Sequence, residues 1–294
     1  MSRNRQVFQT RQYMLTGDYE VYHYQDTGLA SVSIHHHDFF EILFFVRGVV
    51  TYLIEGKAYD LHPGDIVLIN SSELHQAAIR DQSVPYERLV LWMNRSFIQS
   101  LSTEQTNLAS CFTTAGHKNV IRTDIEVQQR VRSLLNQLID LEHYQGFGSD
   151  LLNRACLTEL LILINNEMLN ISQRPKVEVR KSQVIEAVID YINSHLEEEL
   201  RIDDLAERFF LSKFHLSREF REQTGTTLHR FILQKKLIQA KELILRHLSI
   251  TDVYQQCGFG DYSNFFRAFR NEYGMTPKQF YERMLKASAD GPPA

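Results

Sequence analysis

The sequence lacks the features of a membrane protein or a secreted protein. Its longest uninterrupted aliphatic or aromatic stretches, 42–46 and 160–164, are far shorter than the roughly 18 residues that a membrane span needs. The start, MSRNRQVFQT, is basic, but no apolar segment follows it, so it is not a secretory signal. We therefore expect a cytoplasmic protein with no membrane partner.

Cysteine is also scarce. The three cysteines, Cys111, Cys156 and Cys257, are far apart and lack CxxC spacing. This pattern argues against a disulfide framework and against a zinc site built from thiolates. We expect reduced, partly buried thiols.

Neither sign of charge dominates. The 32 Lys and Arg against 36 Asp and Glu leave a net charge of −4, so DNA binding would have to depend on a local basic face. A hydrophobic share of 43% with 23% charged residues is ordinary for a globular protein. The length of 294 residues favours two domains.

The first half of the chain has the pattern of a β domain followed by helices. Between 21 and 91, short runs rich in Val, Ile, Tyr and Phe alternate with Gly and Pro, which predicts an antiparallel sandwich or barrel. From Ile125 the apolar spacing becomes helical, and 151–169 repeats it. A polar segment with Pro175 then predicts a linker. We predict domains at 1–172 and 183–294, with the linker at 173–182.

The second half contains an internal repeat. Segment 202–227 matches segment 250–276, with an offset of 48 that becomes 49 in its second part. Each copy has the layout of a short apolar helix, a tight turn and a second helix, which is typical of a helix-turn-helix unit. Six landmarks of the first copy agree in one register with the second: Leu216, Arg218, Phe220, Arg221, Gly225 and Thr227.

Local turn chemistry supports both copies. Ser212 and Asp261 can each cap a following helix, and Gly258 can end one in the left-handed conformation. Ser249 with Asp252 suits a capping box. Arg201 stands where a cap is expected in the first copy, so we predict that its leading helix begins without a side-chain cap.

The second helix of each copy, 212–223 and 261–272, can enter the DNA major groove. Arg218 and Arg267 are equivalent in the repeat and suit the two acceptors of guanine, whereas Lys213, Arg221 and Arg270 can neutralise phosphates. The intervening helix, 228–247, is about 30 Å long, close to the roughly 34 Å of one DNA turn. Its predicted basic face comprises Arg230, Lys235, Lys236, Lys241 and Arg246.

This region, 183–286, resembles the DNA-binding domain of AraC/XylS transcription regulators. The resemblance depends on KKLIQAKELI, on ITDVYQQCGFGDYSNFFRAFRNEYGMTP and on Pro277 with Phe280. Two departures from the family pattern, Tyr254 for a small Ala and Tyr281 for an Arg, affect the seating of the second unit. The base-contacting positions that the resemblance implies are Phe214, Ser217, Arg218, Tyr262, Ser263, Asn264 and Arg267.

The β domain contains an HxHxxxE pattern. His35 and His37 share a strand face, Glu41 can join them, and His75 follows the turn Pro63-Gly64. Imidazoles and a carboxylate on one inner wall would suit a divalent transition metal. The arrangement resembles the cupin barrel, which implies metal-ligand positions at these four residues.

Two other interpretations compete with the metal. In the one that we favour, the same residues form a polar network lining an effector pocket, without a cofactor. In the other, His36 and its neighbours are partly exposed and incidental. Aromatic residues suited to stacking on a sugar ring include Phe39, Phe44 and Tyr52. The predicted effector-binding set is His35, His37, Glu41, Tyr22, Tyr24, His75 and Trp92.

Together these features predict an α+β protein that regulates transcription and is not an enzyme. The expected parts are a cupin-like β-barrel sensor with following helices, a dimerisation surface on 125–169, and an all-α tandem helix-turn-helix domain. The expected partners are a double-stranded DNA operator, a small-molecule effector with sugars as candidates, RNA polymerase and a second copy of the chain. There are two alternatives. The first is a metal-dependent cupin enzyme, either an oxygenase or an isomerase, with a fused helical domain. The second is a non-catalytic protein-interaction module.

Overall fold

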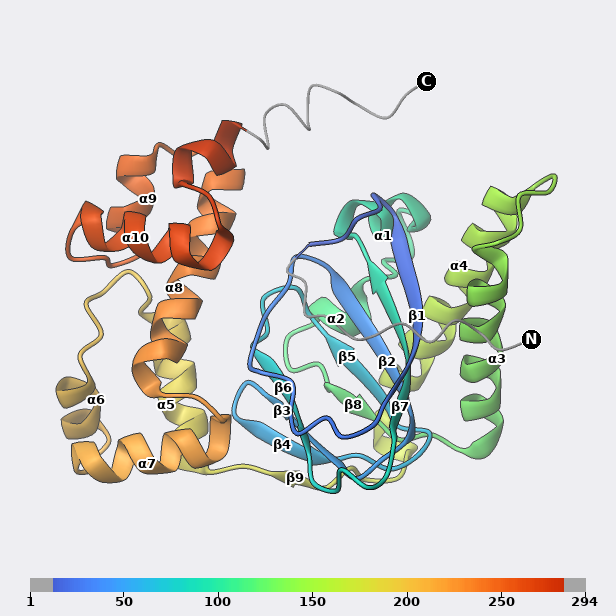
Figure 1. Cartoon of the computed structure of the whole chain (residues 1–294), viewed down its shortest axis with the longest axis horizontal. Coiled ribbons are helices and arrows are strands. Elements are labelled where there is room, and N and C mark those ends of the chain that lie inside the picture. The colour runs from blue at the N-terminus through green and yellow to red at the C-terminus, as the bar shows by residue number, and fades with distance from the viewer. Residues whose placement is uncertain (1–12, 283–294) are drawn as a thin grey trace. The chain divides into compact units, whose positions relative to one another are not determined.

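The computed structural model describes residues 13–282 and divides the chain into two compact units, 1–180 and 181–294 (Figure 1). The basic start of the chain and the last residues of the predicted DNA-binding domain lie outside the described range. Among the described helices, none is long and apolar enough to cross a membrane.

The N-terminal unit is built on two sheets. Every strand pairing is antiparallel, and the sheet orders are β1-β7-β2-β5-β8 and β6-β3-β4-β9. The predicted β-rich, cupin-like architecture is confirmed, but the strands form two sheets and not one closed barrel. The strands are β1 (Tyr19–Asp26), β2 (Phe40–Arg47), β3 (Val50–Ile54), β4 (Lys57–Asp60), β5 (Ile66–Ile69), β6 (His75–Ile79), β7 (Tyr86–Met93), β8 (Val120–Ile121) and β9 (Val179–Arg180).

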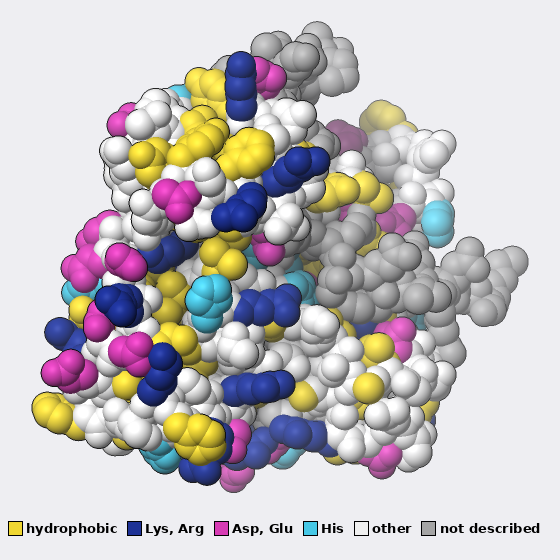
Figure 2. All heavy atoms as spheres, turned by 60° about the vertical axis from the view of Figure 1, so that its left-hand side comes forward, with side chains coloured by type: hydrophobic (Ala, Val, Ile, Leu, Met, Phe, Trp, Pro, Cys, Tyr) yellow, Lys and Arg dark blue, Asp and Glu magenta, His cyan; other side chains and the backbone are white. Residues whose placement is uncertain are grey.

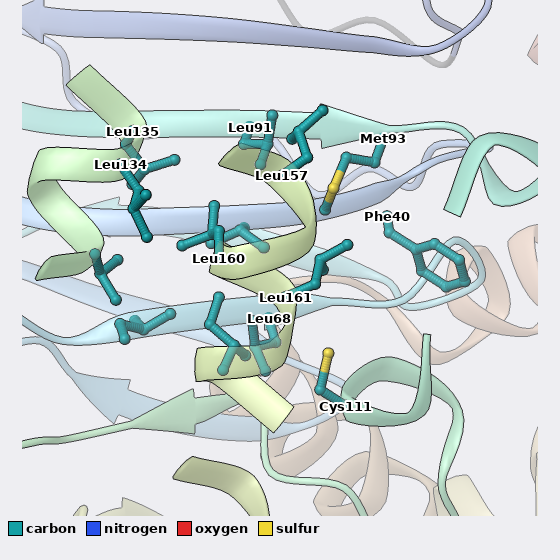
Figure 3. Packing of buried hydrophobic residues seen from close by; sticks show 14 of the residues in the cluster. Phe40, Leu68, Leu91, Met93, Cys111, Leu134, Leu135, Leu157, Leu160 and Leu161 are labelled. Atoms are coloured by element: carbon teal, nitrogen blue, oxygen red, sulfur yellow. The ribbon is translucent and has the colours of Figure 1, made fainter. Parts of the chain in front are cut away.

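The five-stranded sheet is buried on both faces. Successive side chains of a strand point to opposite faces, so Phe40, Ile42 and Phe44 of β2 pack into a cluster with the helices, and Leu43 and Phe45 pack between the sheets. Phe44 therefore faces the helices and not the space between the two sheets, where a sugar-stacking residue would be needed. Figure 3 shows Leu134, Leu135, Leu157, Leu160 and Leu161 of the helices over Phe40, Leu68, Leu91 and Met93 of the sheet.

Two long helices cover this sheet where the sequence predicts them. They are α3 (Ile125–Leu141) and α4 (Ser149–Leu169), and shorter elements, α1 (Arg95–Leu101), α2 (Ser110–Thr113) and η1 (Ile171–Gln173), complete the unit. The Asp124 carboxylate accepts a hydrogen bond from the Val127 amide, which caps α3. Part of the predicted linker is ordered as β9, which pairs with β4 through Val179 and Arg180.

The C-terminal unit is helical, with one short helix before the repeat. Ser212, Ser249 and Asp261 each accept a backbone N–H as predicted, Gly258 has a φ of +60°, and Arg201 makes no side-chain cap. Its helices are α5 (Gln183–Ser194), α6 (Ile202–Arg208), α7 (Lys213–Thr224), α8 (Leu228–Leu245), α9 (Ile250–Gln256) and α10 (Tyr262–Tyr273).

Candidate nucleic-acid interface and sensor pocket

The predicted recognition helices α7 and α10 bury one apolar stripe each and expose the opposite side. Leu216 and Phe220 of α7 and Phe265 and Phe269 of α10 are fully buried. Leu216, and not the 76% exposed Phe214, is thus the core residue of the first stripe. Of the predicted DNA-contacting residues, nine are exposed and Ser217 is half-buried: Lys213, Phe214, Arg218, Arg221, Tyr262, Ser263, Asn264, Arg267 and Arg270.

On α7, four of the predicted contacts lie together. Phe214, Ser217, Arg218 and Arg221 line one surface hollow of about 660 Å³. Residues three and four apart share a helix face, so these side chains can meet one ligand surface together. Lys213 lies outside this group and forms a 2.9 Å ion pair with Asp203.

On α10, the predicted base-contacting residues are connected by hydrogen bonds. Arg267 donates from Nη2 to Asn264 Oδ1 at 2.7 Å and from Nε to the Ser263 carbonyl at 3.3 Å. These bonds hold the guanidinium near the N-terminal half of the helix. The Tyr254 ring lies 5.7 Å from the Tyr262 ring, so this departure from the family pattern packs against the recognition helix.

The predicted basic face of α8 is wrong for three of its five residues. Lys235, Lys236 and Lys241 are at most 9% exposed, whereas Arg230 and Arg246 are exposed. Helix α8 is central in this unit and packs against α7, α9 and α10, so the aliphatic stems of these lysines are covered on several sides. Figure 2 shows Lys and Arg side chains interspersed with hydrophobic and acidic ones.

In the N-terminal unit, the structure brings the predicted histidines and the carboxylate together. Ligand atoms of His37, Glu41 and His75 all lie within 4.8 Å of one another, and all three residues are buried. The His35 ring centroid is 4.2 Å from that of His75, and an isolated β-bridge joins their backbones. His36 and His37 are buried and His35 is half-buried, so the predicted partial exposure is wrong for His36 and holds for His35.

Backbone carbonyls fix the tautomers of these rings. Nδ1 of His35, His37 and His75 lies 2.9 to 3.0 Å from the carbonyls of Ser33, Phe39 and Glu73. Because a carbonyl only accepts, each Nδ1 must have the proton, and Nε2 is unprotonated in a neutral ring. Nε2 of His37 lies 3.5 Å from Glu41 Oε2, whereas Nε2 of His75 has no hydrogen-bond partner among the described residues.

The electrostatics of the cluster favour neutral His35 and His75 and a charged Glu41. Burial, and then the neighbouring His37, lowers the pKa of His35 to about 4, and burial lowers the pKa of His75 well below its usual value. Burial opposes ionisation of Glu41, but hydrogen bonds from His37 and Trp92 outweigh it and lower the pKa of Glu41. The cluster is therefore rich in hydrogen-bond acceptors at neutral pH.

The donor set fits a divalent transition metal. Neutral imidazole nitrogens and a carboxylate are the ligands that such ions prefer, and an Nδ1–H bonded to a carbonyl is the usual support of a metal-binding histidine. His37, Glu41 and His75 would hold the ion, and His35 lies beside them. His75 Nε2 and the Glu41 carboxylate are acceptors that equally fit hydroxyl groups of an organic ligand.

The predicted aromatic residues line the same interior. Trp92 Nε1 donates to Glu41 at 2.7 Å, and the Tyr22 ring lies 5.0 Å from Trp92 and 5.2 Å from Tyr24. Tyr52 also hydrogen-bonds Glu41, and burial raises the pKa of Tyr52 well above 10, so its hydroxyl remains a donor. These contacts join the polar cluster to an aromatic wall.

Arg88 is a further residue of this interior and was not predicted from the sequence. This β7 residue is 1% exposed, its guanidinium lies 4.0 Å from the Tyr86 ring and 4.9 Å from the Tyr24 ring, and it pairs with Asp26. Arg88 precedes Val90 by two residues and Trp92 by four. Because alternate residues of a strand share a face, this spacing could have predicted that Arg88 faces the same interior. Arg88 adds a buried cation to the interior.

Comparisons with known proteins cover both units. The model of the AraC-like ligand binding domain matches residues 18–161, and a helix-turn-helix domain model matches 205–283. The activator RhaS of Salmonella paratyphi A is 27% identical over 85% of this chain and 87% of its own length. RhaS of Escherichia coli O139:H28 is also 27% identical, over 83% and 85%. The DNA-binding domain of AdpA, solved with a target DNA, is 24% identical over 37% of this chain and all of that chain, with a TM-score of 0.36.

A sensor domain joined to a tandem helix-turn-helix domain defines a ligand-responsive, DNA-binding transcription regulator. The two family models and the full-length relatives agree on the particular family. The chain belongs to the AraC/XylS family of transcription regulators.

Proposed function

We propose that this regulator responds to a polyhydroxylated small molecule, with sugars as the first candidates, and controls genes for its metabolism. The observation that supports this most directly is the unpartnered Nε2 acceptor of His75 beside the ionised Glu41. Hydroxyl groups can donate to both, and the adjoining Tyr22 and Trp92 rings suit the apolar face of a sugar.

The regulator acts as a cytoplasmic homodimer in this proposal and has no catalytic role. Helix α4 supports dimerisation, because Leu151, Ile162 and Leu169 are 67%, 44% and 80% exposed and lie eleven and seven residues apart, close to whole helical turns. The relatives named as transcriptional activators support contact with RNA polymerase as the output.

A divalent metal is the second candidate for the sensor, favoured by the convergence of His37, Glu41 and His75. When bound, such an ion would supply a Lewis acid that accepts an effector oxygen. The protein residues would hold the ion and exclude bulk water, since all three are buried.

Titration of the full chain with sugars, followed by Trp92 fluorescence, tests the proposal. Trp92 is the only tryptophan and contacts Glu41, so a bound sugar should change its emission. We expect a saturable change that His75→Ala abolishes, and a matching shift in DNA affinity by gel mobility. Elemental analysis of chain purified without chelator separates the candidates: far less than one equivalent of transition metal supports the sugar, and one equivalent that His75→Ala loses supports the metal.

A further inference from the structure

Helix α8 contains a buried lysine that the DNA-contacting surface does not use. Lys236 is 6% exposed, and its Nζ donates to the Glu198 carbonyl at 2.6 Å and to the Gly258 carbonyl at 2.7 Å. Glu198 lies in the loop before α6, in the first half of the unit. Gly258 lies in the turn between α9 and α10, in the second helix-turn-helix. One ammonium group thus joins both halves.

The backbone around this contact is closely packed. Gly258 has a φ of +60°, and a Cβ at this position would lie 2.4 Å from the Glu198 carbonyl oxygen and 2.7 Å from that of Glu197. No side chain is tolerated there, for reasons of both conformation and space. The Lys236 ammonium also lies 5.9 Å from the centroid of the Phe259 ring. The loop before α6 and the turn before α10 are therefore in direct contact around Lys236.

This contact has a consequence for DNA recognition. The core of the second helix-turn-helix is built on the C-terminal half of α8. Leu237, Ala240 and Ile244 of this helix pack in one cluster with Phe265 and Phe269. Rotation of the first helix-turn-helix relative to this core would pull the Glu198 carbonyl away from Gly258. Charge-assisted bonds of a buried ammonium to two carbonyls resist that movement, because breaking them leaves buried polar groups unsatisfied.

We propose that Lys236 is a positioning residue that fixes the spacing and orientation of the two recognition helices, and thereby the spacing of the two DNA segments that one chain accepts. Lys236 itself touches no DNA in this proposal. The inference rests on both recognition helices binding DNA. A lysine that only stabilised the fold would affect affinity or melting temperature without changing which spacing is preferred.

Selection from a library of random DNA duplexes tests this with the full chain, since it requires no known operator. The spacing between the two recovered recognition segments should be single for the wild-type chain. Lys236→Met keeps the aliphatic stem but removes the donors, and should spread recovery over several adjacent spacings. Lys236→Arg should restore the single spacing. Arg246→Met, the same charge change at an exposed site of the same helix region, should leave the spacing unchanged.

A single unchanged spacing for folded Lys236→Met would overturn the proposal. If no chain recovers paired segments, the two-segment binding mode itself is wrong, which is a separate failure. If Lys236→Met does not fold, spin labels at Glu207→Cys in α6 and Asn271→Cys in α10 provide the measurement, in an otherwise wild-type chain mixed with excess unlabelled chain. Double electron–electron resonance should give one narrow distribution of the distance between the two labels, with and without DNA. A broad distribution in the free chain would contradict the proposal.

Discussion

At the scale of single residues, the sensor cluster shows how neighbouring backbone sets the chemistry of a side chain. His35, His37 and His75 each bond Nδ1 to a carbonyl two residues away along the chain. The proton position is then a consequence of local chain geometry. Alternation along a strand could predict that His35 and His37 share a face. The donor atoms of Glu41 and His75 come from strands of different sheets, so they come together only through the packing of the two sheets, which the sequence pattern does not contain.

Arg218 and Arg267 provide the residue-scale test of DNA recognition. Each is exposed on its recognition helix, so Arg218→Ala and Arg267→Ala should each lose about 1 to 3 kcal/mol at one base position while nonspecific binding changes little. The larger effect is expected at Arg218, because Tyr254 packs against the second helix and can alter its seating. Competition binding with base-substituted duplexes measures this.

Lys213→Ala is the control for both arginine variants. Its partner is Asp203, and its expected role is phosphate neutralisation, so binding should weaken equally on specific and random DNA. If the arginine variants behave in the same uniform way, Arg218 and Arg267 contact only phosphate.

At the scale of helices and strands, the sequence was most informative about features that depend on residues close together in the chain. The repeat and its caps predicted α6, α7, α9 and α10, because a cap depends on residues three positions apart. Periodicity failed for α8: its lysines lie between apolar positions, as on a solvated face, yet Lys235 and Lys241 are buried by packing with other helices. The sequence could not distinguish two separate sheets from a closed barrel, because closure of a barrel depends on strand pairing at the sheet edges.

The N-caps of α6 and α7 lead to two predictions, in which the stability of the C-terminal unit changes in opposite directions. Ser212 Oγ accepts from the His215 amide, whereas Arg201 makes no such bond. Ser212→Ala should therefore destabilise the C-terminal unit by about 1 kcal/mol, and Arg201→Ser should stabilise it by up to about that amount. Urea unfolding followed by far-UV circular dichroism reports the helices.

Trp92 fluorescence is the internal control for these two variants, because the only tryptophan lies in the N-terminal unit. Its transition should stay at the same urea concentration. Equal shifts in both signals would mean that the two units unfold together, and no shift in either would contradict the capping argument.

The exposed face of α4 leads to a prediction about assembly. Ile162→Asp places a charge among apolar side chains, so it should convert the expected dimer into a monomer in sedimentation velocity. Val49→Asp is the matched control, because Val49 is also 44% exposed but lies in the connection between β2 and β3. A wild-type chain that sediments as a monomer, or an Ile162→Asp chain that remains dimeric, would rule out this face.

At the scale of the whole molecule, the effector and the operator are linked through one chain. An effector changes DNA affinity only to the extent that it binds one conformation better than another, and typical coupling is about 1 to 3 kcal/mol. Segment 173–182 connects the two units in sequence, and its β9 residues belong to the sensor's four-stranded sheet. In a dimer, a change in this segment would alter how the two DNA-binding units are presented.

Reciprocity makes this coupling testable. A sugar that changes operator affinity by some factor must have its own affinity changed by the same factor when operator is bound. Residues 183–294 alone should still bind DNA, but more weakly, because the second arm of the dimer is lost, and without any response to the sugar. Calorimetry on the full chain, with and without saturating operator, measures the factor. Identical sugar affinities in the two titrations would show that the sensor does not act through DNA affinity, and effector-dependent contact with RNA polymerase would then be the output to test.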